Sequence, residues 1–285
     1  MNNAAKEFSQ AFIALSVALA VGWAGSQHGY TLSGIPVMLF CVGTAFLIQW
    51  LVFLHAWRFR TDRYFDLTGS LTYLSVLLLA MTFGNSEPRS LLLGTLVSVW
   101  ALRLGTFLFQ RVSRDGHDRR FDQIKTRFST FFMTWTLQGL WVSLTLAAGL
   151  AAMTATDSVP LGPLAFVGAL VWLFGFIIEA IADRQKNRFR ADPANAGRFI
   201  TDGLWAWSRH PNYFGEITLW LGIALIALPV LKGWQYVTLI SPLFVYVLLT
   251  RISGVGMLER RADRAWGSDP DYQAYKARTP VLMPK

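Results

Sequence analysis

Long apolar runs alternate with short polar segments along the whole chain. A helix needs about 20 mostly apolar residues to cross the hydrocarbon core of a bilayer, and several runs reach that length. The predicted spans are residues 9–27, 34–55, 67–84, 90–110, 129–153, 161–182, 212–230 and 234–252. The pattern therefore predicts an all-α integral membrane protein with seven to eight transmembrane helices.

The basic residues recur in every second connection between these runs. Segments 56–66, 110–128, 183–213 and 251–285 hold 22 of the 26 Lys and Arg, and the connections between them are short and nearly neutral. Cytoplasmic loops of membrane proteins carry an excess of Lys and Arg. We therefore expect a multi-pass membrane protein with both termini in the cytoplasm.

Composition narrows the functional classes further. The 285 residues are 53% hydrophobic and include 12 Trp and 21 Phe, and the net charge is +9. Because the charge lies in loops between spans, membrane topology explains it better than nucleic-acid binding does. The single cysteine, Cys41, excludes an intrachain disulfide or a cysteine metal cluster, and the four histidines are dispersed. We expect no metal, no nucleic-acid partner, and one polytopic domain over residues 1–285, with a monomer favoured.

Segment 203–216 is the densest polar and aromatic stretch, reading Gly-Leu-Trp-Ala-Trp-Ser-Arg-His-Pro-Asn-Tyr-Phe-Gly-Glu. Pro211 disfavours helical geometry at His210 and is well tolerated in the first turn of a helix. A helix beginning there would place Asn212 and Glu216 on one face. Its N-terminus would favour an anion.

The sixth predicted span ends in a second polar pattern. Glu179, Asp183, Asn187 and Arg190 are spaced by four, four and three residues, which places them on one face of a continuing helix. Ionisable residues at membrane depth usually face a partner or a cavity. They either pair with neighbouring arginines at the interface or line a polar cofactor site, and the nearby Asn212 favours the second interpretation.

The third predicted span begins with a similar polar face. Asp66, Ser70 and Tyr73 are spaced by four and three residues. Asp66 either caps the helix, as aspartate often does, or joins the Tyr73 phenol in polarising a substrate carbonyl. At the end of the last span, Arg251 either extends its side chain to the interface or meets a phosphate. The tail, residues 259–285, is expected to form amphipathic structure on the membrane face.

Segment 203–216, with Asp183-Arg-Gln-Lys and the tail sequence Tyr272-Gln-Ala-Tyr-Lys-Ala-Arg-Thr-Pro-Val-Leu-Met-Pro, resembles the steroid 5-alpha-reductase superfamily. The likeness is closest to its bacterial DUF1295 branch and covers about residues 160–285. It implies a reductase-like bundle that holds NADPH and reduces the C=C bond of a lipophilic enone, with residues 1–128 on the substrate side. By position it implies cofactor contacts at Asp183, Arg190, Asn212, Glu216 and Arg251, and Glu179 stands where the steroid enzymes have an asparagine. The full cofactor-binding set that we expect adds Glu179, Asn187, Arg209, His210 and Tyr213. The bacterial branch also implies a protein of the bacterial inner (cell) membrane.

Two departures from the reductase pattern keep other functions open. The reductase tyrosine expected in the fourth span is absent where the sequence reads Trp100-Ala-Leu-Arg103, so Tyr73 or Tyr64 would act with Asp66 as the catalytic groups. The His and Tyr expected after Arg251 are also absent. Arg209-His210-Pro211-Asn-Tyr213-Phe-Gly215 also has a more distant resemblance to isoprenylcysteine carboxyl methyltransferases, in which Glu259 would be half of an acidic pair. A methyltransferase using S-adenosylmethionine and a non-catalytic lipid-binding membrane protein are therefore the alternatives.

Overall fold

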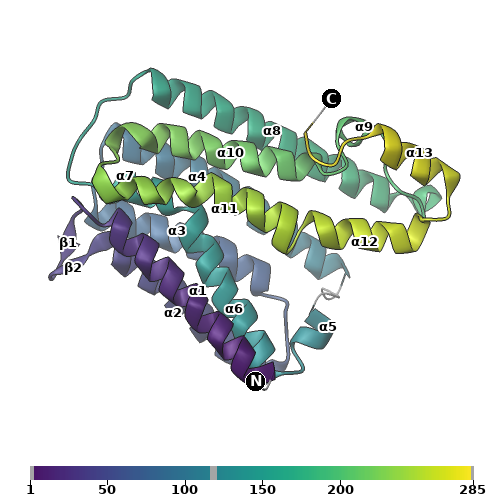
Figure 1. The fold of residues 1–285 in the computed structure, drawn as a ribbon, viewed down its shortest axis with the longest axis horizontal. Coiled ribbons are helices and arrows are strands. Elements are labelled where there is room, and N and C mark those ends of the chain that lie inside the picture. Colours follow the sequence, from purple (N-terminus) through teal and green to yellow (C-terminus); the bar gives the residue numbers. More distant parts are fainter. Residues whose placement is uncertain (1–2, 116–120, 284–285) are drawn as a thin grey trace. The chain divides into compact units, whose positions relative to one another are not determined.

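The computed structural model describes residues 3–115 and 121–283, and these form an almost wholly helical protein (Figure 1). Arg119 and Arg120, which contribute to the basic segment 110–128, lie outside these ranges. Seven helical stretches are long and apolar enough to cross a membrane, and an eighth counts if one bent pair is a single span. The prediction of an all-α multi-pass membrane protein with seven to eight spans is confirmed. The inner membrane and the cytoplasmic termini stay predictions.

The described residues form two compact units. The N-terminal unit comprises residues Met1–Ala165 and Ile226–Ser241, and the C-terminal unit comprises Phe166–Leu225 and Pro242–Lys285. Across the described residues of both units, the α-helices longer than one turn are α1 (Asn3–Gly25), α2 (Val37–Phe59), α3 (Phe65–Phe83), α4 (Pro88–Asp115), α6 (Phe128–Thr145), α7 (Ala147–Thr154), α8 (Pro163–Ala191), α10 (Pro211–Ala227), α11 (Ile240–Val247), α12 (Val255–Trp266) and α13 (Pro270–Arg278). The single polytopic domain expected from the sequence stays a prediction.

In the N-terminal unit, α2 packs against α1, α3 and α6, and α3 also packs against α4. A small hairpin, β1 (Thr31–Leu32) with β2 (Ile35–Pro36), precedes α2, and the short α5 (Phe121–Ile124) contacts α6. The core is aromatic and aliphatic, with Phe46, Phe53 and Trp135 almost fully buried. The bundle is held by the close packing that apolar helices require in lipid.

The fifth predicted span, 129–153, is not one straight helix. Helices α6 and α7 meet at Leu146 with a bend of 57°. No proline or glycine marks this position. The Thr145 carbonyl accepts a hydrogen bond from the Ser241 hydroxyl, and α7 packs against the 3₁₀ helix η3 (Gly233–Leu239). The bend is therefore accompanied by contacts with residues 233–241, about 90 residues further along the chain. Apolar periodicity cannot predict contacts that are so distant in sequence.

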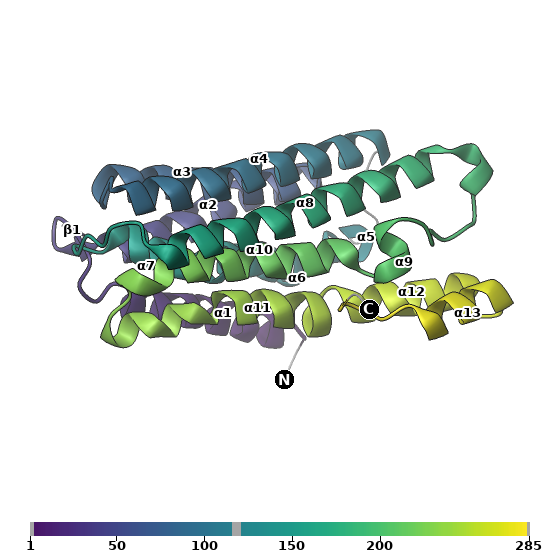
Figure 2. The same ribbon diagram turned by 90° about the horizontal axis from the view of Figure 1, so that it is seen from above.

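In the C-terminal unit, α8 and α10 run side by side (Figures 1 and 2). A Cβ added at Gly215 would lie 2.6 Å from the Glu179 nitrogen and the Gly175 oxygen, and one at Gly222 would lie 2.6 Å from the Gly168 oxygen. Small residues let membrane helices approach backbone to backbone in this way. We call this close contact between the α8 and α10 backbones the α8–α10 seam. The seam brings the polar end of α8 next to the start of α10.

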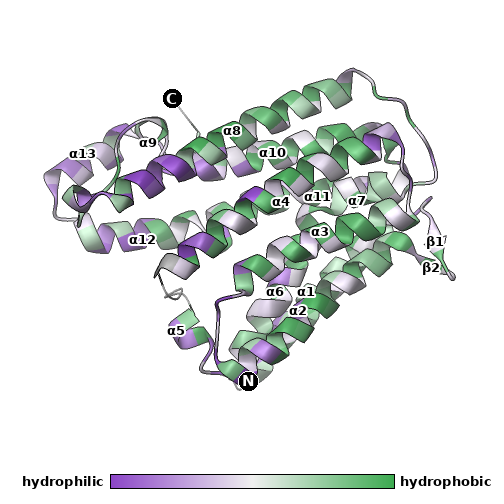
Figure 3. Ribbon diagram, turned by 180° about the vertical axis from the view of Figure 1, so that it is seen from behind, coloured by the Kyte–Doolittle hydropathy of each residue, from purple (hydrophilic) through white to green (hydrophobic). Residues whose placement is uncertain are grey.

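The polarity of α8 changes along its length. Figure 3 shows an apolar first part and a hydrophilic last part, which ends at Ala191. After α8 come η1 (Pro193–Asn195) and the one-turn α9 (Leu204–Trp207), before α10 begins at Pro211 as predicted. The chain leaves α11 through a π-helical turn, η4 (Leu248–Ile252), and ends in α12 and α13. In the C-terminal unit, polar sequence thus occurs at the end of α8, in the connection from η1 to α10, and in α12 and α13.

Candidate functional site

The first polar cluster of the C-terminal unit joins α8 to α10. The Asn212 side-chain amide donates a hydrogen bond of 3.3 Å to the Asp183 carboxylate. Glu179 and Asp183 are 2% and 7% exposed, and Glu216 is half-buried one turn beyond Asn212. The Gly175–Gly215 contact sets the two helices close enough for this pairing. Two buried carboxylates and an amide thus lie together, although 29 residues separate Asp183 from Asn212.

The second polar cluster surrounds the loop before α10. The Glu259 carboxylate on α12 accepts a short hydrogen bond from Arg209 and lies 2.9 Å from His210 Nε2. Lys276 Nζ on α13 lies 3.9 Å from Glu259 and 2.5 Å from Asp263. The Arg209 and His210 side chains are 11% and 6% exposed, so their pairing with Glu259 is largely shielded from water, whereas Lys276 and Asp263 lie at the exposed edge of the cluster.

The surroundings of His210 favour the neutral form of its imidazole ring. Burial lowers its pKa because the charged form loses water, and this outweighs the raising effect of Glu259. Its ring stacks on Tyr213 with centroids 5.6 Å apart. Within the described residues, His210 Nδ1 and Arg209 Nε are buried without a hydrogen-bond partner. Such atoms are uncommon in folded proteins and suggest a ligand or water contact.

The C-terminal tail covers the segment 203–210. The Tyr275 hydroxyl donates to the Trp205 carbonyl at 2.7 Å, and the Ser208 hydroxyl donates to the Leu282 carbonyl at 2.9 Å. The Arg209 backbone N–H donates to the Pro280 carbonyl at 2.9 Å. Burial raises the pKa of Tyr275 to about 12. The tail packs as a structural part of this unit and buries Tyr275; its expected contact with the membrane face stays a prediction.

The remaining predicted cofactor residues differ in exposure. Asn187 is half-buried on α8, one turn beyond Asp183, and Arg190 is exposed near the end of that helix. Arg251 is exposed in η4. Lys186, which the sequence did not single out, places its ammonium 4.2 Å from the centre of the Trp205 ring. The structure therefore brings Asp183 and Asn212 together, groups Arg209 with His210, and leaves two arginines at the surface.

The predicted catalytic residues lie in the N-terminal unit. Tyr64 is the N-cap residue of α3, so Asp66 is not the cap; it stands in the first turn and lies 3.6 Å from Arg111 Nη2. Tyr64 is 38% exposed and its ring contacts His55 with centroids 6.0 Å apart. Asp66 is therefore paired with an arginine on α4, and Tyr64 lies at the unit's surface.

Tyr73 is completely buried. Its hydroxyl makes a short hydrogen bond to the Thr145 hydroxyl, which itself donates to the Trp141 carbonyl at 2.8 Å. Because the Thr145 proton is used in that bond, Tyr73 is the donor to Thr145. The Tyr73 ring lies 5.2 Å from the ring of Trp100, which belongs to the fourth-span stretch where the resemblance expects a tyrosine. Tyr73 thus supplies a phenol beside that position.

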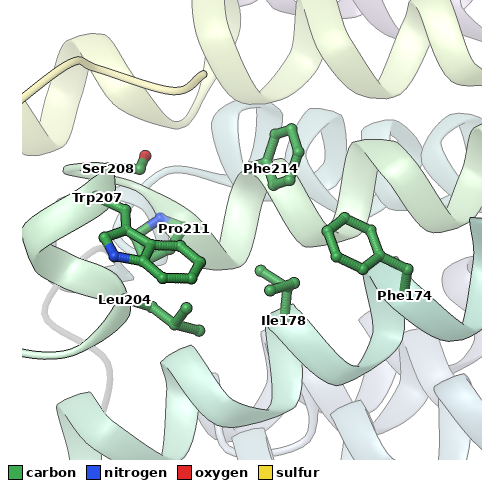
Figure 4. Close-up of a pocket in the computed structure, with 7 residues that line it drawn as sticks. All are labelled: Phe174, Ile178, Leu204, Trp207, Ser208, Pro211 and Phe214. Atoms are coloured by element: carbon green, nitrogen blue, oxygen red, sulfur yellow. The ribbon is translucent and has the colours of Figure 1, made fainter. Parts of the chain in front are cut away.

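Two hollows adjoin segment 203–216 within the C-terminal unit. One, of about 130 Å³, lies between α8, α9 and α10 (Figure 4) and is apolar apart from Ser208; it is lined by Phe174, Ile178, Leu204, Trp207, Ser208, Pro211 and Phe214. The other, of about 330 Å³, is open and more polar, and its lining includes Gln185, Arg188 and Asp202. The apolar hollow suits a lipid-like group, and the open one suits a polar group.

Glu259 is the main site residue that reasoning from the sequence did not assign to the cofactor-binding set. Its partners Arg209 and His210 precede it by about 50 residues. One signal existed, because Glu259 is an acidic residue between an apolar helix and the basic residues Arg260 and Arg261. A buried acid in such a place needs a basic partner.

A family profile matches most of the chain. The family described as "Protein of unknown function (DUF1295)" matches residues 52–279. This region includes both polar clusters and the predicted catalytic residues.

Three relatives with named functions match shorter stretches of the chain. The chain is 33% identical to a Delta(14)-sterol reductase of Mus musculus over 102 residues, which is 30% of this chain and 24% of that protein. It is 28% identical to 3-oxo-5-alpha-steroid 4-dehydrogenase 1 of Bos taurus over 74 residues, 26% of this chain and 28% of that protein. It is 30% identical to a "Probable O-methyltransferase" of Ustilaginoidea virens over 80 residues, 28% of each. The chain thus matches about a quarter of the length of each relative, and no solved structure matches it.

Proposed function

The chain belongs to the DUF1295 family, and from this membership we propose that it is a membrane oxidoreductase that uses NADPH to reduce the C=C bond of a lipophilic enone. The relatives support a reductase in general, because two of them are named as a sterol reductase and a steroid dehydrogenase. The identity of the cofactor and of the substrate is the proposal.

The observation that carries the proposal is the pairing of Asp183 with Asn212 beside the buried Glu179. Buried carboxylates are costly in a membrane protein unless they serve a partner or a ligand. Carboxylates accept hydrogen bonds from ribose hydroxyls and carboxamide N–H groups, and an asparagine amide offers both a donor and an acceptor. This set of side chains is suited to the nucleoside parts of a pyridine dinucleotide.

The basic side chains complete the fit to NADPH. Arginine and lysine bind phosphate oxygens, arginine through two parallel hydrogen bonds. Arg190 and Lys186 stand on the same helix as Asp183, and Arg209 and its unpartnered Nε lie at the start of α10. NADPH carries phosphates and S-adenosylmethionine carries none, so these residues favour the dinucleotide. When bound, NADPH would supply the hydride for the β-carbon of the enone.

The N-terminal unit would supply the groups that act on the substrate. Tyr73 is proposed to give a proton to the α-carbon of the reduced enone, and Asp66 to orient the carbonyl group. Reduction of the double bond then uses one hydride and one proton. The Tyr73 O–H now donates a hydrogen bond to the Thr145 hydroxyl, so proton donation to the substrate requires the O–H to turn away from Thr145. The apolar character of both units suits a lipid-like substrate.

A methyltransferase is the second candidate, favoured by one specific contact. Arg209 and His210 both bind Glu259, the residue that the resemblance to isoprenylcysteine carboxyl methyltransferases singles out. The relative named as a probable O-methyltransferase supports the same class. Arg260 occupies the second acidic position of that pattern, which weakens the match.

Calorimetry on the purified protein in mild detergent distinguishes these functions. We expect NADPH to bind and S-adenosylmethionine not to bind. Asn212→Ala should weaken NADPH binding about 10-fold, because a hydrogen bond near a charged group contributes about 1.5 kcal/mol. Arg190→Ala should weaken it similarly. Thr218→Ala is the matched control on α10, because among the described residues its hydroxyl bonds only to the Phe214 carbonyl, at 2.7 Å.

Each other outcome points to a different conclusion. Binding of S-adenosylmethionine without NADPH would reverse the order of the two candidates. Binding of neither would favour a lipid-binding protein without catalysis. Equal NADPH affinity in the wild type, Asn212→Ala and Arg190→Ala would place the cofactor elsewhere.

A further inference from the structure

The second polar cluster contains a histidine whose two ring nitrogens stand in different environments. His210 Nε2 lies 2.9 Å from a Glu259 oxygen, whereas Nδ1 is buried and has no hydrogen-bond partner within the described ranges 3–115 and 121–283. A neutral imidazole carries one proton, and the hydrogen bond made by one nitrogen decides which nitrogen carries it. A carboxylate accepts hydrogen bonds only, so the proton belongs on Nε2.

We infer that Glu259 is a positioning residue that fixes His210 in the Nε2–H tautomer and so makes Nδ1 an acceptor for an uncharged N–H or O–H donor of the ligand. The inference rests on the proposed function only for the identity of that ligand. An unprotonated Nδ1 repels phosphate oxygens, which are acceptors too. The cofactor would therefore meet His210 through an amide, amino or hydroxyl group, and its phosphates would be bound by other residues.

The charges around His210 support the neutral form. Glu259 approaches from α12, and its charge is shared among Arg209 in the same loop, His210 and Lys276 on α13. Lys186 on α8 and Arg209 both disfavour a second proton on the ring, and burial disfavours it most. The carboxylate thus orients the ring without charging it. In carboxylate–histidine pairs of this kind, the hydrogen bond to the carboxylate sets which ring nitrogen carries the proton.

Asp263 provides a matched control for Glu259. It stands one turn further along α12 and carries the same charge. It binds Lys276 at 2.5 Å and the Tyr272 hydroxyl at 3.0 Å. Within the described ranges the Asp263 carboxylate hydrogen-bonds Lys276 and Tyr272, whereas Arg209 and His210 hydrogen-bond Glu259. Replacing either acid removes one negative charge beside Lys276, but only Glu259 holds the histidine.

Nitrogen NMR of protein labelled with ¹⁵N-histidine tests the inference without any cofactor. At pH 7 we expect the His210 signals to show a protonated Nε2 and an unprotonated Nδ1. Glu259→Ala should add the Nδ1–H form, whereas Asp263→Ala should leave the wild-type pattern. Unchanged His28 and His55 signals would show that the N-terminal unit is still folded in each variant.

Three results would overturn the inference. The first is a wild-type His210 protonated on Nδ1 alone. The second is the same tautomer in Glu259→Ala as in the wild type. The third is conversion of His210 to the doubly protonated form on titration with inorganic pyrophosphate, which would assign this position to phosphate. Because these readouts precede cofactor binding, failure of the NADPH proposal in calorimetry would leave them interpretable.

Discussion

The two units bury polar side chains in different ways. In the N-terminal unit most of them are neutral and pair across helices: Gln49 with Thr72 at 2.8 Å, and Tyr73 with Thr145. Its buried charges are tied to fixed partners, as when Arg89 donates to the carbonyls of Pro160 and Ile226 at 2.6 Å. In the C-terminal unit, Glu179, Asp183 and the Arg209–Glu259 pair concentrate charge around segment 203–216.

This difference separates polar groups that hold helices together from polar groups that serve a ligand. A neutral hydrogen bond between helices contributes about 0.6 kcal/mol in membranes and specifies packing. A buried charge costs more than it returns unless a partner compensates it, so a cluster of them is weak support for stability and stronger support for function. We therefore expect substitutions in the N-terminal unit to change mainly stability, and substitutions in the C-terminal clusters to change mainly binding.

The largest expected effect is on the seam that brings the C-terminal clusters together. Gly215→Leu would place a side chain against the backbone of Glu179 and Gly175, 2.6 Å from where its Cβ must lie. Overpacking of this kind costs about 3 kcal/mol or more. We expect loss of NADPH binding and a large fall in thermal stability. Gly43→Leu is the control, since nothing lies within 4 Å of its Cβ position; an equal loss there would refute the role of the seam.

The next-largest effect is expected for Tyr73→Phe, which tests whether Tyr73 does more than join helices through its hydrogen bond to Thr145. Tyr73→Phe removes the hydroxyl that binds Thr145. If Tyr73 supplies the proton, the rate of enone reduction should fall about 100-fold, the lower end of general acid catalysis. NADPH affinity should stay unchanged. Thr145→Val, which removes the partner but keeps the phenol, should lower stability and leave most of the rate; equal rates in both variants would make Tyr73 a packing residue.

A smaller effect is expected for Asp183→Asn, which should change cofactor binding at the first polar cluster without lowering stability. Asp183→Asn keeps the shape of the side chain and removes its buried charge. We expect NADPH affinity to fall about 10-fold, or 1.4 kcal/mol, while the unfolding temperature stays the same or rises. Thr72→Val should do the opposite, lowering stability by about 1 kcal/mol because Gln49 loses its acceptor. Both variants are measured for unfolding temperature and for NADPH affinity by calorimetry. If Asp183→Asn and Thr72→Val each lowered both quantities, the proposed difference between the two units would be wrong.

Periodicity and charge predicted the parts of the fold that depend on local sequence. The apolar runs located the spans, the start of α10 at Pro211 follows from proline chemistry, and helical spacing placed Glu179 and Asp183 on one face. Pairings distant in the chain were not predictable. The bend at Leu146 and the contacts of Glu259 with Arg209 and His210 depend on segments at least 49 residues apart, and one sequence carries no direct signal for such distances.

The smallest expected effect is the contribution of His210 to pH dependence. Its pKa in the folded protein is lowered by burial, below the value of about 6.5 expected for an unfolded chain. Between these two values the unfolded state binds more protons, so the free energy of unfolding falls as the pH drops below about 6.5 and stops falling below the folded pKa. The slope from one proton cannot exceed about 1.4 kcal/mol per pH unit. His210→Gln should flatten this slope between pH 7 and pH 5 when unfolding is measured in mixed micelles. An unchanged slope in His210→Gln would show that the ring is protonated as easily in the folded as in the unfolded chain, and that the second cluster does not exclude charge from His210.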